Sequence, residues 1–419
     1  MTTWEYNDYQ QWIKDDCKVN DKVIELHISG YKLINISENI GNLINLQELN
    51  CSISQLIELP EILGNLINLR ILSCDKNQLT KLPKTLSNLI NLQELNCSNN
   101  KLTKLSETFG NLINLQELNC SNNKLTKLPE TFGNLINLRI LSCCRNQLIK
   151  LPKTFGNFIN LKELRCCNNK LIELPETFGN LINLQELYCT YNKLTKLPKT
   201  ISNLINLRRL CCSDNKLIEL SKTIGNLTKL YELDCSYNKL TELPKTIGNL
   251  TNLYELNCSY NELTELPKTT GNMTNLYKLE CSYNKLTELP KTIGNLINFC
   301  ELYCSINKLT KLPISIIKLQ HLYKLECDEN IQLPLILQRF IERIENNDVH
   351  NNSIQTSLLD SINNLLSETI TKDINLINDN IIDNKTKSTL YNFIEDKTTG
   401  VLLISFGELL VYILQKIEN

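Results

Sequence analysis

A period of 23 residues runs through most of this chain and constrains its fold more than any other feature. Cysteine recurs at this interval from Cys51 to Cys327, and an asparagine three positions later recurs from Asn77 to Asn330. Each copy follows the pattern L-x-x-L-x-C-x-x-N-x-L-x-x-L-P, and a GNL or SNL segment comes next. A unit this short cannot bury its own apolar face, so successive copies have to stack and share a core.

Within one copy, the residues around the cysteine are expected to alternate between the two faces of a short strand. Leu118 and Cys120 would then point into the core, where a free cysteine acts as a hydrophobic filler one size smaller than leucine. The asparagine column is expected to satisfy backbone groups in the turns. Pro129 favours an extended exit from the strand, and Phe132 and Leu138 are expected to close the opposite side of the core.

This pattern resembles the leucine-rich repeat family, in particular its intracellular 23-residue class with an LP step after the strand. The resemblance covers about fourteen copies, in residues 23–337. It implies an α/β solenoid, a right-handed leucine-rich repeat horseshoe with a parallel sheet on its concave side. The chain departs from the family at the cysteine, which replaces the second strand leucine, and the first copy has Ile28 there.

Residues 1–22 and 338–419 lie outside the repeats. Trp4, Tyr9 and Trp12 suggest a short helical N-terminal cap over the first open repeat. Towards the other end, apolar residues recur at helical spacing, which predicts a small helical C-terminal module. The expected helices cover 333–345, 354–370, 374–393 and 401–417.

Composition argues against several classes of protein. The net charge of −1 argues against a dedicated nucleic-acid binder. No secretory signal is evident at the start, and the apolar stretch 401–414 is short and carries Glu408, so we expect no membrane span. Thirteen of the eighteen cysteines belong to the repeat, and so many thiols favour a reducing compartment. We therefore expect a cytoplasmic protein.

The sequence contains no P-loop, no G-x-S-x-G motif and no H-E-x-x-H motif. His27, His321 and His350 have no motif partners, and residues 331–419 contain no cysteine. They therefore lack the nucleophile of the ubiquitin-ligase domain that some bacterial leucine-rich repeat proteins carry. We expect no enzymatic activity, cofactor or metal; a soft-metal or disulfide pair at Cys144 and Cys167 is a minor alternative.

Three columns of each copy are expected on the exposed strand face: the fourth residue before the core cysteine, the residue just before it, and the second residue after it. Ten of the fifteen tyrosines fall in these columns: Tyr188, Tyr191, Tyr231, Tyr237, Tyr254, Tyr260, Tyr277, Tyr283, Tyr303 and Tyr323. At a strand spacing of about 5 Å, they would form continuous ladders. Exposed tyrosines are favoured binding anchors, although duplication history alone could also have spread them.

A basic zone precedes the tyrosines in the same or neighbouring columns. Its members are Arg139, Arg145, Lys162, Arg165, Arg208 and Arg209. A partner protein with an acidic segment and an apolar anchor would match both zones, whereas a solvated surface is the alternative. Interspersed glutamates such as Glu186 and Glu232 argue against single-stranded nucleic acid.

Together these observations predict a non-enzymatic module that binds a partner protein on its concave face. A structural or self-assembling role is the alternative, and an enzyme in the C-terminal module is the least favoured one. The bias to Ile, Asn and Lys and the near-identical GNLINLQELNCS copies are similar to leucine-rich repeat proteins of giant DNA viruses of amoebae. This similarity implies a host partner in the host cytoplasm, although an AT-rich protist is another possible source.

Overall fold

A computed structural model describes residues 2–328, 331, 337, 338, 340, 341 and 344. Fifteen strands form one sheet, in which every strand pairs with its neighbours in chain order. All the pairings are parallel, as in β1 with β2 and β6 with β7. The strands are β1 (Thr2–Glu5), β2 (Val23–His27), β3 (Glu48–Asn50), β4 (Ile71–Ser73), β5 (Glu94–Asn96), β6 (Glu117–Asn119), β7 (Ile140–Ser142), β8 (Glu163–Arg165), β9 (Glu186–Tyr188), β10 (Arg209–Cys211), β11 (Glu232–Asp234), β12 (Glu255–Asn257), β13 (Lys278–Glu280), β14 (Glu301–Tyr303) and β15 (Lys324–Glu326).

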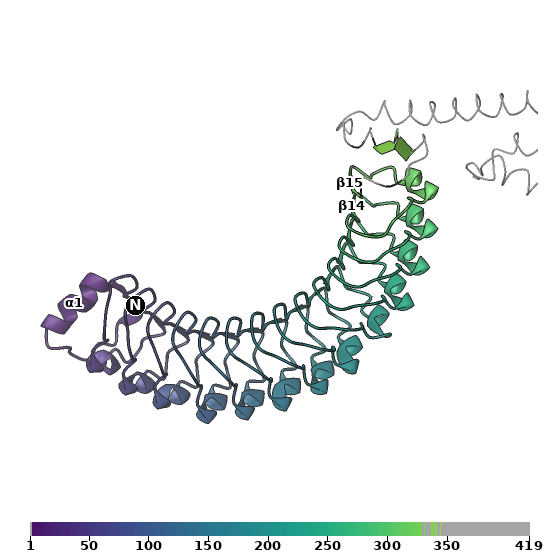
Figure 1. Ribbon diagram of the computed structural model, residues 1–419. Helices are drawn as coiled ribbons and strands as arrows, with labels where there is room; N and C mark the ends of the chain where they lie inside the picture. Colours follow the sequence, from purple (N-terminus) through teal and green to yellow (C-terminus); the bar gives the residue numbers. More distant parts are fainter. Residues whose placement is uncertain (1, 329–330, 332–336, 339, 342–343, 345–419) are drawn as a thin grey trace, which may run out of the picture. The chain divides into compact units, whose positions relative to one another are not determined.

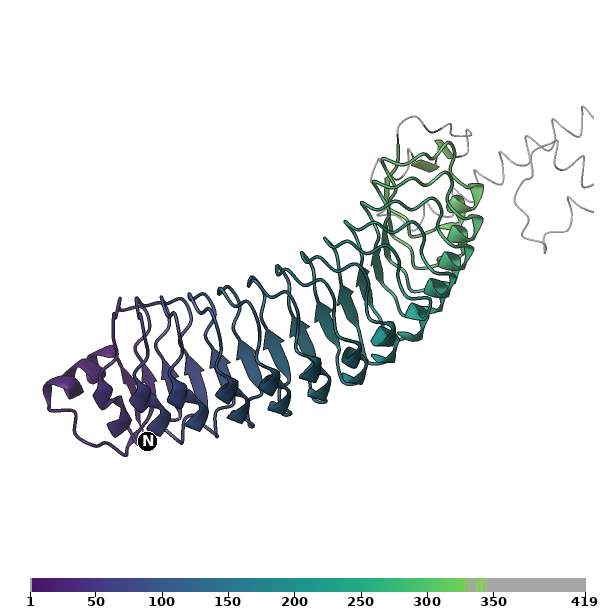
Figure 2. The same ribbon diagram turned by 60° about the horizontal axis from the view of Figure 1, so that its bottom comes forward.

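Each strand from β2 to β14 is followed by a short 3-10 turn. Figure 1 shows these turns along the outer side of the curved repeat region, and Figure 2 shows the strands side by side on the other side. Glycine near the end of most of these segments disfavours a longer α-helix. The turns are η1 (Glu38–Asn42), η2 (Glu61–Asn65), η3 (Lys84–Asn88), η4 (Glu107–Asn111), η5 (Glu130–Asn134), η6 (Lys153–Asn157), η7 (Glu176–Asn180), η8 (Lys199–Asn203), η9 (Ile224–Asn226), η10 (Lys245–Asn249), η11 (Lys268–Asn272), η12 (Lys291–Asn295) and η13 (Ile314–Lys318).

The register places equivalent residues of successive copies opposite one another. Leu118 pairs with Leu95 on one side and with Leu141 on the other, which is one period in each direction. Each column of the sequence therefore becomes a row across the sheet, and neighbours in a row come from consecutive copies.

The predicted inward positions form the core. Leu118 and Cys120 are buried, as are Phe132 and Leu138. The twelve repeat cysteines from Cys51 to Cys304 are fully buried and unpaired, which confirms their role as core filler. Cys327, in the last described copy, is partly exposed.

The asparagine column also behaves as expected. The amide of Asn123 donates to the carbonyl oxygens of Cys97, Cys120 and Ser121 at 3.0, 3.1 and 3.2 Å. Its side-chain oxygen accepts the backbone N–H of Leu102 at 2.9 Å. One side chain thus satisfies backbone groups of two adjacent copies, which ties the copies together.

The N-terminal residues contain a strand as well as the expected helix. Helix α1 (Tyr6–Lys14) buries Tyr9 and Trp12, and the Tyr9 hydroxyl accepts the backbone N–H of Ser37 at 3.0 Å. Strand β1 precedes the helix and pairs with β2, so the sheet extends one strand beyond the repeats. The sequence did not suggest this strand, because its four residues depend on a pairing with a distant segment.

Most of the predicted C-terminal module lies outside the described residues, including the expected helices at 354–370, 374–393 and 401–417. Within 333–345, the described positions 337, 338, 340, 341 and 344 are helical, and Leu337, Phe340 and Ile344 are buried. Among the helices that the structure describes, none combines the length and apolarity needed to cross a bilayer.

Candidate partner-binding face

The three predicted columns form three rows across the concave side of the sheet. We call them the start row (Gln116 and its equivalents), the middle row (Asn119 and its equivalents) and the end row (Asn122 and its equivalents). The start row lies just before the strands and the middle row lies at their last residue. The end row lies in the turn beyond, where the backbone of Asn122 has a φ of 53°.

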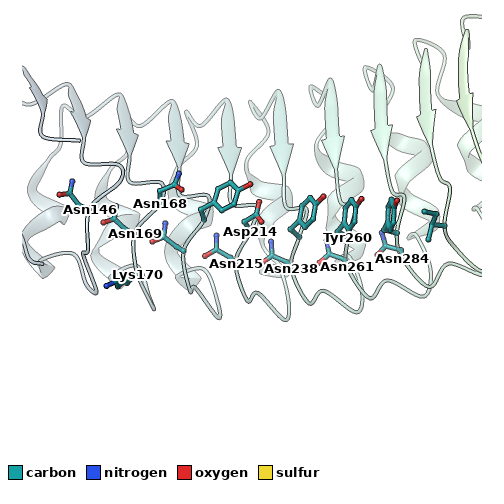
Figure 3. A pocket seen from close by; sticks show the side chains of 15 residues that line it. Asn146, Asn168, Asn169, Lys170, Asp214, Asn215, Asn238, Tyr260, Asn261 and Asn284 are labelled. Carbon is teal, nitrogen blue, oxygen red and sulfur yellow. The ribbon is translucent and has the colours of Figure 1, made fainter. Parts of the chain in front are cut away.

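Three tyrosines stack face to face in the end row. The ring centroids of Tyr237 and Tyr260 are 4.0 Å apart, as are those of Tyr260 and Tyr283, and the planes differ by 10° and 11°. Figure 3 shows Tyr260 standing above the asparagine column of Asn238, Asn261 and Asn284. We call these three rings the end stack; they line an open groove of about 1050 Å³ that runs along this edge of the sheet.

A second stack lies in the start row, near the opposite ends of the strands. The centroids of Tyr231 and Tyr254 are 4.9 Å apart and those of Tyr254 and Tyr277 are 4.7 Å apart, again with nearly parallel planes. Tyr323 lies edge-on to Tyr277, and their hydroxyl oxygens are 2.7 Å apart. We call Tyr231, Tyr254 and Tyr277 the start stack.

The structure corrects the expectation of continuous ladders. In the end row, Asp214 separates Tyr191 from Tyr237, and in the start row Cys300 separates Tyr277 from Tyr323. Tyr188 and Tyr303 lie in the middle row, and no described ring stacks on either of them. The aromatic surface therefore consists of two short stacks along opposite edges, with Tyr188 and Tyr303 in the row between them.

Each of the two middle-row tyrosines makes a cation–π contact with a basic side chain of the chain itself. The Arg165 guanidinium lies 5.1 Å from the ring centroid of Tyr188, and the Lys278 ammonium lies 5.4 Å from that of Tyr303. The Tyr188 hydroxyl donates to Glu186 at 2.7 Å. Burial and this hydrogen bond raise the pKa of Tyr188 to about 12, against the opposing effect of Arg209.

The basic zone divides into paired and unpaired cations. Arg165 pairs with Glu163, and Arg209 bridges Glu186 and Glu232 at 3.5 and 3.2 Å. The other four members are exposed and make no ion pair with any described residue: Arg139, Arg145, Lys162 and Arg208. Only these four have their charge free for a partner.

The adjacent thiols of the basic zone interact with each other. The backbone N–H of Cys167 donates to the Cys144 sulfur at 3.2 Å. A hydrogen bond from the Cys144 thiol lowers the pKa of Cys167, and the same interaction raises the pKa of Cys144. Within the described part of the chain, no three metal-ligating side chains come together.

Two further rows of residues were not predicted from the sequence, although both recur in the "NLIN" segment of the copies. The asparagine six positions before the core cysteine bridges copies, as where Asn114 donates to the Ile90 carbonyl oxygen at 2.9 Å. The isoleucine just before that asparagine is exposed in eight consecutive copies, and Ile113 is 50% exposed. This isoleucine row comprises Ile44, Ile67, Ile90, Ile113, Ile136, Ile159, Ile182 and Ile205. Extended exposed apolar surface of this kind is uncommon on monomeric proteins.

Comparisons with known proteins agree with this architecture. The model described as "Leucine-rich repeat region" matches residues 152–236 and 192–285, "Leucine Rich repeats (2 copies)" matches 67–110, and "Leucine Rich Repeat" matches 114–135. Among curated proteins, none matches the sequence significantly.

Several solved structures are similar to this chain. A leucine-rich repeat protein of Leptospira interrogans is 31% identical with a TM-score of 0.70, and the match covers 82% of this chain and 98% of that one. The plant peptide hormone receptor RGFR1, in complex with RGF2, is 30% identical with a TM-score of 0.63; the match covers 74% of this chain but 56% of the receptor. The functional domain of InlJ from Listeria monocytogenes, which includes a cysteine ladder, is 31% identical with a TM-score of 0.52, over 59% of this chain and 51% of that one.

Proposed function

Because this chain belongs to the leucine-rich repeat family, whose generally non-enzymatic members are typical protein-binding scaffolds, we propose that it binds a partner protein on its concave face. The observation that carries the proposal is the presence of two tyrosine stacks on this face, beside four cations that form no ion pair with a described residue. Tyrosine rings supply large contact areas at a small cost in conformational entropy, and their hydroxyls supply hydrogen bonds.

The two zones favour a partner with two kinds of contact. An acidic segment would pair with Arg139, Arg145, Lys162 and Arg208, and apolar or aromatic anchors would pack on the end stack and the start stack. The plant peptide hormone receptor RGFR1, whose structure is similar, was solved in complex with RGF2, so a similar solenoid does bind another polypeptide. Charged contacts of this kind weaken as salt is added, because exposed charges are screened.

The test compares partner capture by the purified chain and by variants that retain the backbone preferences of each row. One variant carries Tyr237→Asn, Tyr260→Asn and Tyr283→Asn, because asparagine already occupies the end row at Asn99 and Asn122. The other carries Tyr231→Gln, Tyr254→Gln and Tyr277→Gln, because glutamine occupies the start row at positions 93 and 116. A matched control replaces exposed lysines of another row, Lys104, Lys127 and Lys150, with glutamine.

A partner bound on the concave face should lose affinity by about tenfold or more in at least one tyrosine variant, while the lysine control retains it. Affinity is measured with the purified partner by calorimetric titration. If both tyrosine variants bind as tightly as the original chain, the concave face is not the binding surface.

The source and location of the protein form a further part of this proposal. We propose a giant virus of amoebae as the source and a host protein in the host cytoplasm as the partner. The composition and the near-identical copies support this source, and the many unpaired thiols support a reducing compartment. Capture from amoebal lysate, compared with lysate of an unrelated cell, tests it directly.

A second candidate function is self-assembly, which the exposed isoleucine row favours. Copies of the chain could bury these rows against one another. Sedimentation over a range of concentrations would then show association that a variant with Ile113→Thr, Ile136→Thr and Ile159→Thr abolishes. Threonine is the matched replacement, because Thr228, Thr251 and Thr274 occupy the same row in later copies. A single concentration-independent species would contradict this candidate.

A further inference from the structure

The end row contains one interruption between aromatic residues. Tyr191, Asp214 and Tyr237 follow one another in consecutive copies, and the end stack continues from Tyr237. Figure 3 shows the Asp214 carboxylate in the same row as the ring of Tyr260. In the copy that contains Asp214, the end row therefore has a carboxylate between the tyrosines of the two neighbouring copies.

The spacing of the end stack defines what fits beside Tyr237. Its rings follow one another at 4.0 Å, with planes within 11° of parallel. A flat group at the level of Asp214 would therefore lie about 4 Å from the Tyr237 ring, which is a stacking distance. The side chain of Tyr237 is 47% exposed, and no described ring covers its face towards Asp214. One aromatic face is thus open next to a carboxylate.

No described cation of the chain forms an ion pair with the carboxylate at this position. Asp214 is partly exposed and makes no ion pair with any described residue, although Lys193 and Lys216 lie on the turns nearby. Asp234, one copy later, adds a second carboxylate close by. Burial and the charge of Asp234 raise the pKa of Asp214, against a hydrogen bond from Tyr191. These surroundings favour a cation.

The molecule contains two complete examples of the same arrangement. Arg165 pairs with Glu163 and lies over the ring of Tyr188 in the next copy. Lys278 pairs with Glu280 at 2.7 Å and lies over the ring of Tyr303 in the next copy. In each case a cation, a carboxylate and a tyrosine ring one copy later form a triad. Asp214 and Tyr237 provide the carboxylate and the ring, and the described chain provides no cation.

We propose that the interval between Tyr191 and Tyr237 binds the guanidinium group of an arginine side chain from the partner protein. This inference rests on the proposed function, because it identifies one contact of that partner. A guanidinium is flat enough to continue the end stack by one level, and its N–H groups can donate in pairs to the Asp214 carboxylate. An ammonium group is more strongly hydrated and does not stack in this way.

The test uses a small probe, Nα-acetyl-arginine methylamide, and the full-length chain. A 3-fluorotyrosine placed at position 237 reports binding through its fluorine NMR signal. We expect a saturable shift with the arginine probe and an affinity about tenfold lower for the citrulline analogue, which keeps the shape but loses the charge. Asp214→Asn should cause a comparable loss, and asparagine suits this backbone position because Asn168 occupies it two copies earlier.

A matched label at position 283, at the far end of the stack beside Ile306, should not respond to the probe. The proposal is overturned if the position-237 signal does not respond, or if the citrulline or lysine analogue binds as tightly as arginine. It is also overturned if Asp214→Asn binds the arginine probe unchanged. Partner capture that depends on the tyrosine stacks but occurs without any arginine response would refute this contact and leave the proposed function standing.

Discussion

At the scale of single residues, the end row shows an unusual backbone requirement. Its residues have φ between 51° and 56° in every copy from Ile53 to Ile306, although none of them is glycine. Asparagine and aspartate tolerate this left-handed conformation, whereas β-branched and aromatic side chains adopt it at a cost. The tyrosines of the end stack therefore occupy a position that favours asparagine, and their ring contacts offset part of that cost.

Replacing Ile53 with asparagine should relieve this strain. Because Ile53 is β-branched and half exposed, Ile53→Asn is expected to raise the free energy of unfolding by about 1 kcal/mol. Thermal and urea unfolding of the two proteins measure the change. The reverse substitution at an equivalent position, Asn122→Ile, should destabilise by a similar amount. If Ile53→Asn is destabilising, the strain argument fails.

The thiols should react in an order set by their surroundings. The hydrogen bond from Cys144 lowers the pKa of Cys167, so a larger fraction of this thiol is in the reactive thiolate form at pH 7 than for an ordinary cysteine, and that fraction falls as the pH is lowered. Burial raises the pKa of core thiols such as Cys120 and shields them. Mass spectrometry after brief alkylation at pH 7 should find Cys167 modified first.

The control for this order is Cys144→Ala, which removes the donor and should slow alkylation of Cys167 at pH 7 by shifting its pKa towards the usual value. Cys300, whose pKa is raised by burial and by Glu301, provides an internal comparison. Faster labelling of Cys300 than of Cys167 would contradict the assignment.

At the scale of secondary-structure elements, the 3-10 turns pack too closely for a side chain at their glycine. A Cβ atom on Gly133, in η5, would lie 2.5 Å from the Cβ of Thr154 and 2.9 Å from its carbonyl oxygen, in η6. Similar contacts recur at other copies, as between Gly179 and Thr200. The glycine of the "GNL" segment therefore determines how closely successive turns approach on the outer side.

Gly133→Ala should consequently force η5 and η6 apart. We expect a loss of about 2 kcal/mol in unfolding free energy, in the range measured for overpacked sites. Ser87 occupies the equivalent position in η3, so Ser87→Ala provides a matched control and should change stability by less than about 0.5 kcal/mol. Equal stability of Gly133→Ala and the original chain would show that the turns can separate freely.

At the scale of the whole molecule, a stack of copies depends on protection of its ends. Strand β1 and helix α1 cover the first copy, where Val23, Leu26 and Ile28 are fully buried. Removing residues 2–22 would expose these side chains and the hydrogen-bonding edge of β2.

This truncation should destabilise the first copies more than the later ones, because each copy contacts only its neighbours. Hydrogen exchange should accelerate in β2 and β3 while β11 and β12 keep their protection, and sedimentation should show association through the exposed edge. A control that deletes only residues 2–5 leaves α1 in place and should have a smaller effect. Uniform loss of protection along the solenoid would contradict nearest-neighbour stability.

Much of the architecture could be predicted because it repeats. Leu118, Cys120 and Asn123 recur at a constant interval, and a constant interval in the sequence becomes a constant register in the sheet. The burial of the leucines and cysteines and the hydrogen bonds of the asparagines follow from this register, since each depends only on equivalent neighbours one copy away.

The pairing of β1, the ion pairs and the ring contacts depend on distances between side chains or segments that the repeat pattern does not specify. The sequence by itself determined the solenoid, its core rows and the rows on which the tyrosines lie. Only the tertiary structure decided that β1 joins the sheet, that Arg209 bridges two glutamates and that the tyrosines form two short stacks. The physical reason is that a 23-residue period places residues in rows, whereas ion pairs and ring contacts depend on the conformations that neighbouring side chains adopt.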